Sequence, residues 1–316
     1  MRIGLIDVDG HHFPNLALMR ISAYHKEKGD EVEWWWTDLI HYDVVYMSKV
    51  FSDAYSPDVP EPMNCDRVIK GGTGYAIHLE NGKEVFDKDK HQTLPDEIER
   101  MFPDYSIYPQ FDFAVSMTSR GCPRGCSFCH VASKEGRCSV KVADVKDFWT
   151  PETCKKEIKV LDPNITACKE KRDLMRQYME TKCLLDFTQG LDIRCLNDED
   201  IEDINHMRIK TLHFAWDNPK DDLESKFRRF AERFRRKSNI GTVYCLTNFN
   251  STMEENLYRI TTLSQLGYDP YVMVYNKPSA PQEVIDLQRW CNNKIIFKKC
   301  PNFADYVPTR DQRIRT

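Results

Sequence analysis

Short apolar segments typical of β-strands recur at regular intervals from Phe111 onward. The interval is about 25 to 35 residues, which is the length of one strand followed by one helix. Six segments share this spacing: Phe111–Met117, Glu157–Leu161, Leu184–Phe187, Ile209–Ala215, Ile240–Leu246 and Pro270–Tyr275. Parallel strands connected by helices explain such a repeat, so we expect an α/β fold whose six strand–helix units form a partial (βα)6 barrel.

Signals for helix starts between these segments agree with the repeat. Asn197 precedes three acidic residues that suit the positive end of a helix dipole. Asn218 followed by Pro219 combines a capping side chain with a first-turn proline, and Ser251 with Glu254 forms a capping box. We therefore expect a helix to begin at each of these three places.

The first 77 residues show a shorter alternation of strand and helix patterns. Strands are expected at Ile3–Ile6, Val32–Trp36, Asp43–Ser48 and Arg67–Lys70, with an amphipathic helix at Leu16–Lys28. Prolines and the lack of a helical period between residues 51 and 66 indicate a truncated second crossover. These features predict a small, truncated Rossmann-like βαβ domain over residues 1–77, a connecting segment over 78–110, the barrel over 111–300 and a C-terminal tail over 301–316.

Composition limits the classes of protein that this chain can belong to. Its 45 basic and 49 acidic side chains give a net charge of −4, which argues against a basic nucleic-acid-binding arm. The mean hydropathy of −0.59 and the absence of a long apolar run argue against a membrane protein. The N-terminus reads as a strand rather than a signal peptide, so we expect a cytoplasmic protein.

Three of the twelve cysteines stand close together, directly after the first barrel strand. Cys122, Cys126 and Cys129 form a C-x3-C-x2-C pattern in a loop that contains glycines. Soft thiolates at this spacing suit an iron–sulfur cluster or zinc. Structural zinc usually takes four ligands, and His130 is badly placed to complete such a set because it directly follows Cys129. The pattern therefore favours a 4Fe–4S cluster that keeps one iron without a protein ligand.

At these residues the sequence resembles the radical S-adenosylmethionine superfamily, and in particular the branch with an N-terminal cobalamin-binding-type domain. The resemblance covers residues 111–300 and, more loosely, the first 75 residues. It implies an enzyme in which the open iron binds S-adenosylmethionine and a reductant such as flavodoxin or ferredoxin supplies one electron. The resulting 5'-deoxyadenosyl radical would take a hydrogen from a substrate, which can be a peptide, a nucleic acid or a small molecule.

The strand ends supply candidates for binding S-adenosylmethionine. By resemblance, Phe128 would border the adenine, and the other candidates are Asp162, Asn164, Gln189, Arg194 and Asn248. Two of these have an ordinary structural alternative. Asp162 stands where the family has a different motif and can be a helix cap, and Arg194 can form an ion pair with Asp192. The sequence leaves these alternatives open.

The N-terminal domain partly resembles a cobalamin-binding pattern, in Asp9, His11, Ser48 and Gly71-Gly72. Pro14 stands where a glycine is expected, so we predict that the domain works without cobalamin and covers the barrel. A cobalamin-dependent methyltransferase is one alternative. Another, from a different class, is a non-enzymatic iron–sulfur electron carrier or redox sensor that never cleaves S-adenosylmethionine.

Overall fold

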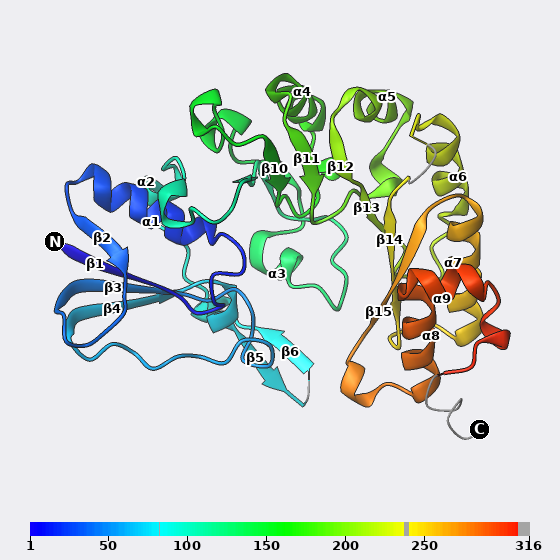
Figure 1. Cartoon of the computed structure of the whole chain (residues 1–316), viewed down its shortest axis with the longest axis horizontal. Coiled ribbons are helices and arrows are strands. Elements are labelled where there is room, and N and C mark those ends of the chain that lie inside the picture. Colours follow the sequence, from blue (N-terminus) through cyan, green and yellow to red (C-terminus); the bar gives the residue numbers. More distant parts are fainter. Residues whose placement is uncertain (82, 237–239, 309–316) are drawn as a thin grey trace. The chain divides into compact units, whose positions relative to one another are not determined.

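The computed structural model describes residues 1–81, 83–236 and 240–308 of the 316-residue chain and shows a mixed α/β protein with parallel sheets (Figure 1). The chain divides into two compact units, Met1–Glu170 and Lys171–Thr316. The domain boundaries expected at residues 77, 110 and 300 stay predictions. Residues 309–316 of the expected C-terminal tail lie outside the described residues.

The first unit begins with a parallel four-stranded sheet, as the sequence predicts. Its strands are β1 (Arg2–Asp7), β2 (Glu31–Trp34), β3 (Tyr42–Ser48) and β4 (Cys65–Gly71), in the order β2-β1-β3-β4. The order reverses between β1 and β3, so the loops after these two strands leave the sheet in opposite directions. In open parallel sheets this is the position where ligands bind.

Helix α1 (Leu16–Glu27) packs on the sheet because its apolar residues share one face. Leu18 and Ile21 are buried against Ile3 and Leu5 of β1. The Asn15 side chain caps the helix by accepting a hydrogen bond from the Leu18 backbone amide.

The segment expected to be a simple connection contributes to this core. Ile98 of the short helix α2 (Asp96–Glu99) joins the same apolar cluster as α1 and β1. A hairpin of β5 (Ile77–Glu80) and β6 (Lys83–Phe86) also forms at the start of this segment, and it was not predicted. Asn81 followed by Gly82 is a strong hairpin signal that could have predicted it.

The cysteine loop leaves the second sheet region of the first unit. Strands β7 (Ala114–Ser116) and β10 (Glu157–Val160) pair in parallel. Two short antiparallel strands, β8 (Ser119–Arg120) and β9 (Val140–Lys141), then bracket the loop, which also contains helix α3 (Val131–Glu135). The strand ends therefore hold both ends of the cysteine segment.

The second unit contains further parallel strands: β11 (Leu184–Phe187), β12 (Ile209–Thr211), β13 (His213–Ala215), β14 (Thr242–Thr247) and β15 (Asp269–Val274). The single strand expected at Ile209–Ala215 is wrong, because it divides at Leu212. β12 pairs with β11, whereas β13 pairs with β14. The Leu212 carbonyl accepts a bond from the Thr242 amide at the break, so the chain changes sheets there.

In the described part of this unit, helices precede, separate and follow these strands: α4 (Lys171–Thr181), α5 (Asp198–His206), α6 (Glu224–Arg233), α7 (Met253–Gln265), α8 (Gln282–Asn292) and α9 (Lys294–Lys299). In Figure 1 helices α4 to α8 lie along one side of the strands. Alternating strands and helices thus continue through this unit, as the sequence spacing predicts.

The helix starts match the sequence signals only in part. Asn197 caps α5 in a capping box, as expected. The box at the start of α7 uses Thr252 and Glu255, one residue later than predicted. Asn218 and Pro219 do not begin a helix: the Asn218 side chain bonds to Asp221 within a turn, and α6 starts at Glu224.

The last part of the described chain belongs to the core of the second unit. Trp290 is buried with Val272 and Leu287, and Phe303 and Tyr306 pack against this cluster. The beginning of the expected C-terminal tail is therefore structured.

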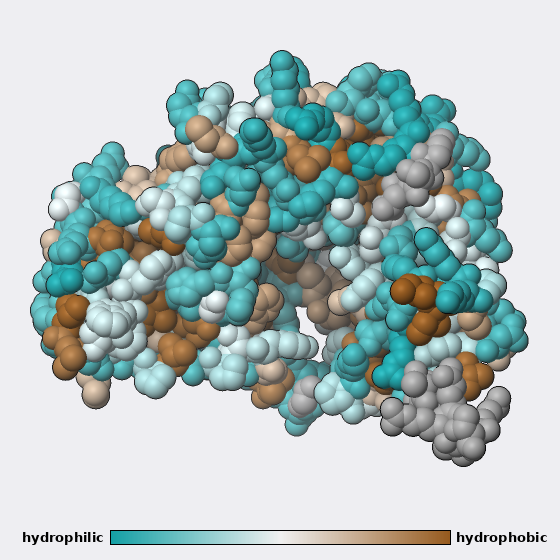
Figure 2. Space-filling model, in the orientation of Figure 1, coloured by the Kyte–Doolittle hydropathy of each residue, from teal (hydrophilic) through white to brown (hydrophobic). Residues whose placement is uncertain are grey.

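Among the described residues no helix is both long and apolar enough to cross a membrane. The face shown in Figure 2 is mostly hydrophilic, with scattered apolar residues.

Candidate functional site

Two glycines with left-handed backbone shape the cysteine loop. Gly121 has φ +86°, and a Cβ there would lie 2.1 Å from the Cys138 carbonyl oxygen. Gly125 has φ +57°, and a Cβ there would meet the Arg137 guanidinium at 2.8 Å. Only glycine fits such positions without strain, so the close turns around Cys122 depend on both residues.

The three cysteines differ in exposure but lie within one short loop. Cys122 and Cys126 are half-buried and Cys129 is exposed. The Cys129 amide donates to the Cys126 carbonyl at 3.0 Å, which closes a turn between these two residues. All twelve cysteines fall within the described residues and none forms a disulfide, while no cluster-like grouping of their sulfurs is shown there.

Asp162 anchors the strand that leads into the loop. Its Oδ2 accepts the Thr118 amide at 3.0 Å, and its Oδ1 accepts the Thr118 hydroxyl at 2.7 Å. The same Oδ1 accepts the Ser119 amide at 2.5 Å and the Ser119 hydroxyl at 2.7 Å. The residue is 2% exposed, and burial raises the pKa of its carboxyl, whereas these four bonds favour the charged form. Asp162 therefore positions the loop, and it is not the helix cap that the sequence left open.

Asn164 connects the end of β10 to the first cysteine. Its Nδ2 donates to the Cys122 sulfur at 3.4 Å. Its Oδ1 accepts the Ala167 amide at 3.2 Å and the Thr166 hydroxyl at 2.9 Å, which orients the amide group with its N–H toward the sulfur. An amide donor stabilises negative charge on a thiolate sulfur. Sequence reasoning expected Asn164 to contact S-adenosylmethionine and missed this contact, which joins parts of the chain 42 residues apart.

Thiol groups are the donors that an iron–sulfur cluster takes, and three of them occur in this loop. Three thiol groups occupy one turn-rich loop, and an oriented amide N–H already contacts one of them. Hydrogen bonds of this kind to cysteine sulfur tune iron–sulfur centres. Phe128 lies inside the loop next to Cys129 and is half-buried.

The other three candidates lie in the second unit, and each has its own local setting. Arg194 donates to Asp192 at 2.7 Å and to Asp221 at 2.8 Å, so its guanidinium is held in a structural ion pair, the alternative to a ligand clamp. Asn248 has a positive φ of 59° and donates to the Tyr275 carbonyl at 2.8 Å. Gln189 is exposed. Their contacts with S-adenosylmethionine stay predictions.

A buried arginine that sequence reasoning missed connects the loop after β13 to strand β14. Arg259 on α7 is fully buried, and its guanidinium donates to the Asp217 and Leu246 carbonyls at 3.0 and 2.9 Å. It also donates to the Asn256 side chain at 2.6 Å. Burial lowers the pKa of Arg259 and raises that of Asp217. The sequence signal for burial at this place was the apolar Ile260, which directly follows Arg259 in the helix.

The residues of the cobalamin-like pattern contact other parts of the N-terminal domain. The Asp9 carboxylate accepts the Val50 amide at 2.6 Å and the Phe51 amide at 3.3 Å. The His11 ring lies edge-on to Trp34, with 4.2 Å between ring centroids. Asp9 thus contacts the loop after β3, and His11 contacts Trp34 at the end of β2.

Ser48 and the paired glycines are likewise engaged within the domain. The Asn15 side chain donates to the Ser48 hydroxyl at 2.9 Å. Gly72 has φ +100°, and a Cβ there would lie 2.3 Å from the Lys49 carbonyl oxygen. The glycine at this position therefore lets two backbone segments approach each other.

Comparison with known proteins finds no relative: no model of a known protein family matches the chain, and no curated protein matches it.

Proposed function

We propose that this protein is a radical S-adenosylmethionine enzyme in which Cys122, Cys126 and Cys129 hold a 4Fe–4S cluster. The observation that carries the proposal is the C-x3-C-x2-C loop at the end of parallel strands, with the Asn164 amide directed at the Cys122 sulfur. Such a cluster, with one iron open to the amino and carboxylate groups of S-adenosylmethionine, supplies the electron that splits this molecule into methionine and a 5'-deoxyadenosyl radical.

The chain's own residues have two roles in this proposal. Asp162 holds Thr118 and Ser119, so the loop starts from a fixed point. Asn164 donates to the Cys122 sulfur and stabilises negative charge there. In these two roles both residues act on the loop, as positioning residues.

The remaining parts of the proposal come from the resemblance. The strand–helix units would form a partial (βα)6 barrel, and six residues would contribute to binding S-adenosylmethionine: Phe128, Asp162, Asn164, Gln189, Arg194 and Asn248. A flavodoxin or ferredoxin would deliver the electron. The substrate is a peptide, a nucleic acid or a small molecule, because the fold alone does not choose among them.

Iron binding tests the first step. Anaerobic reconstitution with iron and sulfide should give about four irons and four sulfides per chain and a broad visible absorbance. Replacing the three loop cysteines by alanine should abolish both signals. Cys154→Ala is the matched control, because Cys154 is exposed and lies outside the loop. A colourless protein that binds zinc on the same cysteines would overturn the proposal.

Cleavage of S-adenosylmethionine tests the second step. The reconstituted protein, reduced with dithionite, should convert S-adenosylmethionine to 5'-deoxyadenosine and methionine in equal amounts. A protein that carries the cluster but forms no 5'-deoxyadenosine would instead be an electron carrier or redox sensor. The two assays therefore separate enzyme from carrier.

The proposed enzyme works without cobalamin. This rests on Pro14 and on the engagement of Asp9 and His11 within the domain. Protein purified anaerobically from cells supplied with cobalamin should contain none. Stoichiometric cobalamin that is lost in His11→Ala would contradict this and make methyl transfer the leading reaction.

A further inference from the structure

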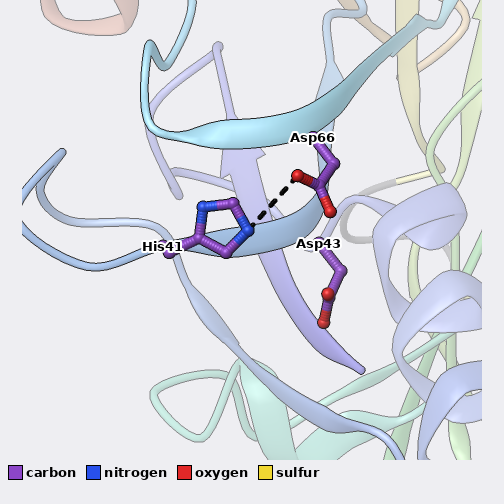
Figure 3. A group of neighbouring side chains, drawn as sticks. All are labelled: His41, Asp43 and Asp66. Atoms are coloured by element: carbon purple, nitrogen blue, oxygen red, sulfur yellow. Dashed lines mark ion pairs between the residues drawn. The ribbon is translucent and has the colours of Figure 1, made fainter.

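Three potential metal ligands meet at the amino end of the N-terminal sheet. His41 precedes β3, Asp43 lies in β3 and Asp66 lies in β4 (Figure 3). One ligand atom from each lies within 4.8 Å of the other two, and in the described part of the chain no other group of three His, Cys, Asp or Glu residues does so. This triad is at the opposite edge of the sheet from Ser48 and Gly71.

The imidazole of His41 is oriented by a neighbour outside the triad. The Asn64 side-chain Nδ2 donates to the Asp38 carbonyl at 2.9 Å, which leaves the Asn64 Oδ1 facing His41 Nδ1 at 3.1 Å. An amide oxygen only accepts hydrogen bonds, so Nδ1 must carry the proton. In the neutral ring Nε2 then has a lone pair, which is the form that binds metal ions.

This lone pair faces a carboxylate. His41 Nε2 lies 3.4 Å from Asp66 Oδ1, and Figure 3 shows the ring pointing toward Asp66 with Asp43 beside it. Two acceptors at this distance repel each other unless a proton or a metal cation lies between them. A cation held between the two groups would relieve this repulsion.

The two aspartates of the triad also repel each other. The register of β3 and β4, with Tyr42 opposite Cys65 and Val44 opposite Arg67, places Asp43 opposite Asp66. Like charges directly opposite each other destabilise a sheet. Asp43 is also oriented from outside the triad, because its Oδ2 accepts the Arg2 backbone amide at 2.5 Å. Partners of this kind, which hold the ligands from behind, are typical of metal sites.

The surroundings are negative. The pKa of the neighbouring Cys65 thiol is raised by burial and, after that, by the carboxylates of Asp38, Asp66 and Glu61. Two nearby cations pair outside the triad: the Arg2 guanidinium with Glu33 at 2.8 Å, and the Met1 ammonium, which also interacts with Asp43, with Asp30 at 2.9 Å. A cation at the triad would be attracted by the same field.

We propose that His41, Asp43 and Asp66 bind one divalent transition-metal ion, such as Mn²⁺, with water completing its coordination. One imidazole nitrogen and two carboxylate oxygens suit this class of metal better than Ca²⁺ or Mg²⁺, which prefer all-oxygen sites. The ion would join the starts of β3 and β4 and offset the repulsion between the two aspartates. The proposal does not depend on the cysteine loop.

Manganese is the probe that separates this site from the cysteines, because thiolates favour softer metals. Titration of the full chain with MnCl₂, with free Mn²⁺ followed by electron paramagnetic resonance, should show one bound ion per chain. His41→Ala and Asp66→Asn should each weaken binding at least about tenfold, and Asn64→Ala should weaken it about 10- to 100-fold by releasing the imidazole.

Controls make the result decisive. His206→Ala removes another exposed histidine that lies near a carboxylate, at 3.7 Å from Glu202, and should leave binding unchanged. Circular dichroism should show that all variants fold, since the His41 and Asp66 side chains are 53% and 67% exposed. No binding at millimolar Mn²⁺, or equal binding by wild type and His41→Ala, would overturn the proposal.

Discussion

The first unit has two places where loops follow the carboxyl ends of paired parallel strands, and the polar side chains at these two edges have different partners. At the carboxyl ends of β1 and β3, Asp9 bonds to the backbone of the next loop and Asn15 bonds to Ser48. At the carboxyl ends of β7 and β10, Asp162 and Asn164 instead hold a loop that carries three cysteines. At the first edge, which we call the closed edge, the polar groups bond to one another. At the second edge they bond to a loop that carries cysteine thiols.

This difference teaches that strand topology alone does not make a site. Parallel sheets place loops together at their carboxyl ends, and both edges have such loops. What distinguishes the second edge is that its buried polar side chains contact the loop that carries reactive groups. The following predictions test whether that distinction is real, starting with the largest expected effect.

Replacing the buried aspartate at each edge should have unequal costs. Asp162→Asn puts an NH₂ group among four donors, so at least one buried backbone donor loses its acceptor, and the variant should lose about 1–3 kcal/mol of unfolding free energy. Asp7→Asn should lose only about 0.5–1.5 kcal/mol, because one amide oxygen can still accept from Tyr108 and the His11 amide. Urea unfolding of both variants measures the difference.

The comparison fails if the two substitutions cost the same. Equal losses would mean that the bonds from Thr118 and Ser119 to Asp162 contribute no more than the bonds that Asp7 accepts. Iron binding offers a second measurement: Asp162→Asn should lower the iron content after reconstitution, whereas Asp7→Asn should leave it unchanged.

The Asn164 contact should tune the proposed cluster. Asn164→Asp keeps the oxygen that accepts from Ala167 and Thr166 but removes the donor to the Cys122 sulfur. A reduced cluster carries more negative charge on sulfur, so losing this donor should lower the midpoint potential. A redox titration of the reconstituted protein, followed by electron paramagnetic resonance, tests this.

Thr166→Val is the control for that experiment. It removes a bond to the Asn164 oxygen and leaves the donor on Nδ2 in place, so the potential should move less. If Asn164→Asp binds iron with an unchanged potential, the contact with Cys122 does not affect the cluster. If no variant binds iron, the cluster proposal itself fails, which is a separate result.

The smallest effect is expected at the closed edge. Asp9→Ala frees the Val50 and Phe51 amides, but both residues are exposed and water can replace the carboxylate. The unfolding free energy should fall by about 0.5 kcal/mol, with unchanged iron content. A loss of iron in this variant would show that the two edges act together.

Local patterns predicted the strand and helix succession because each depends on neighbours in sequence. Leu184–Phe187 was predicted with its observed bounds, and Asn197 was predicted as a cap. The break at Leu212 was missed because the apolar pattern is continuous there, and only pairing with β11 on one side and β14 on the other divides it. The ion pair of Arg194 with Asp221 was also missed, because the two residues are 27 positions apart in the sequence.

The sequence by itself determined the alternating α/β organisation and the three-cysteine loop, since periodicity and spacing are properties of neighbouring residues. It did not determine which polar groups support that loop. Asp162 lies 44 positions from Thr118, and Asn164 lies 42 positions from Cys122. Asp43 meets Asp66 only through the register of two strands. Such contacts depend on how distant segments pack, because a buried polar group must find its partner in three dimensions.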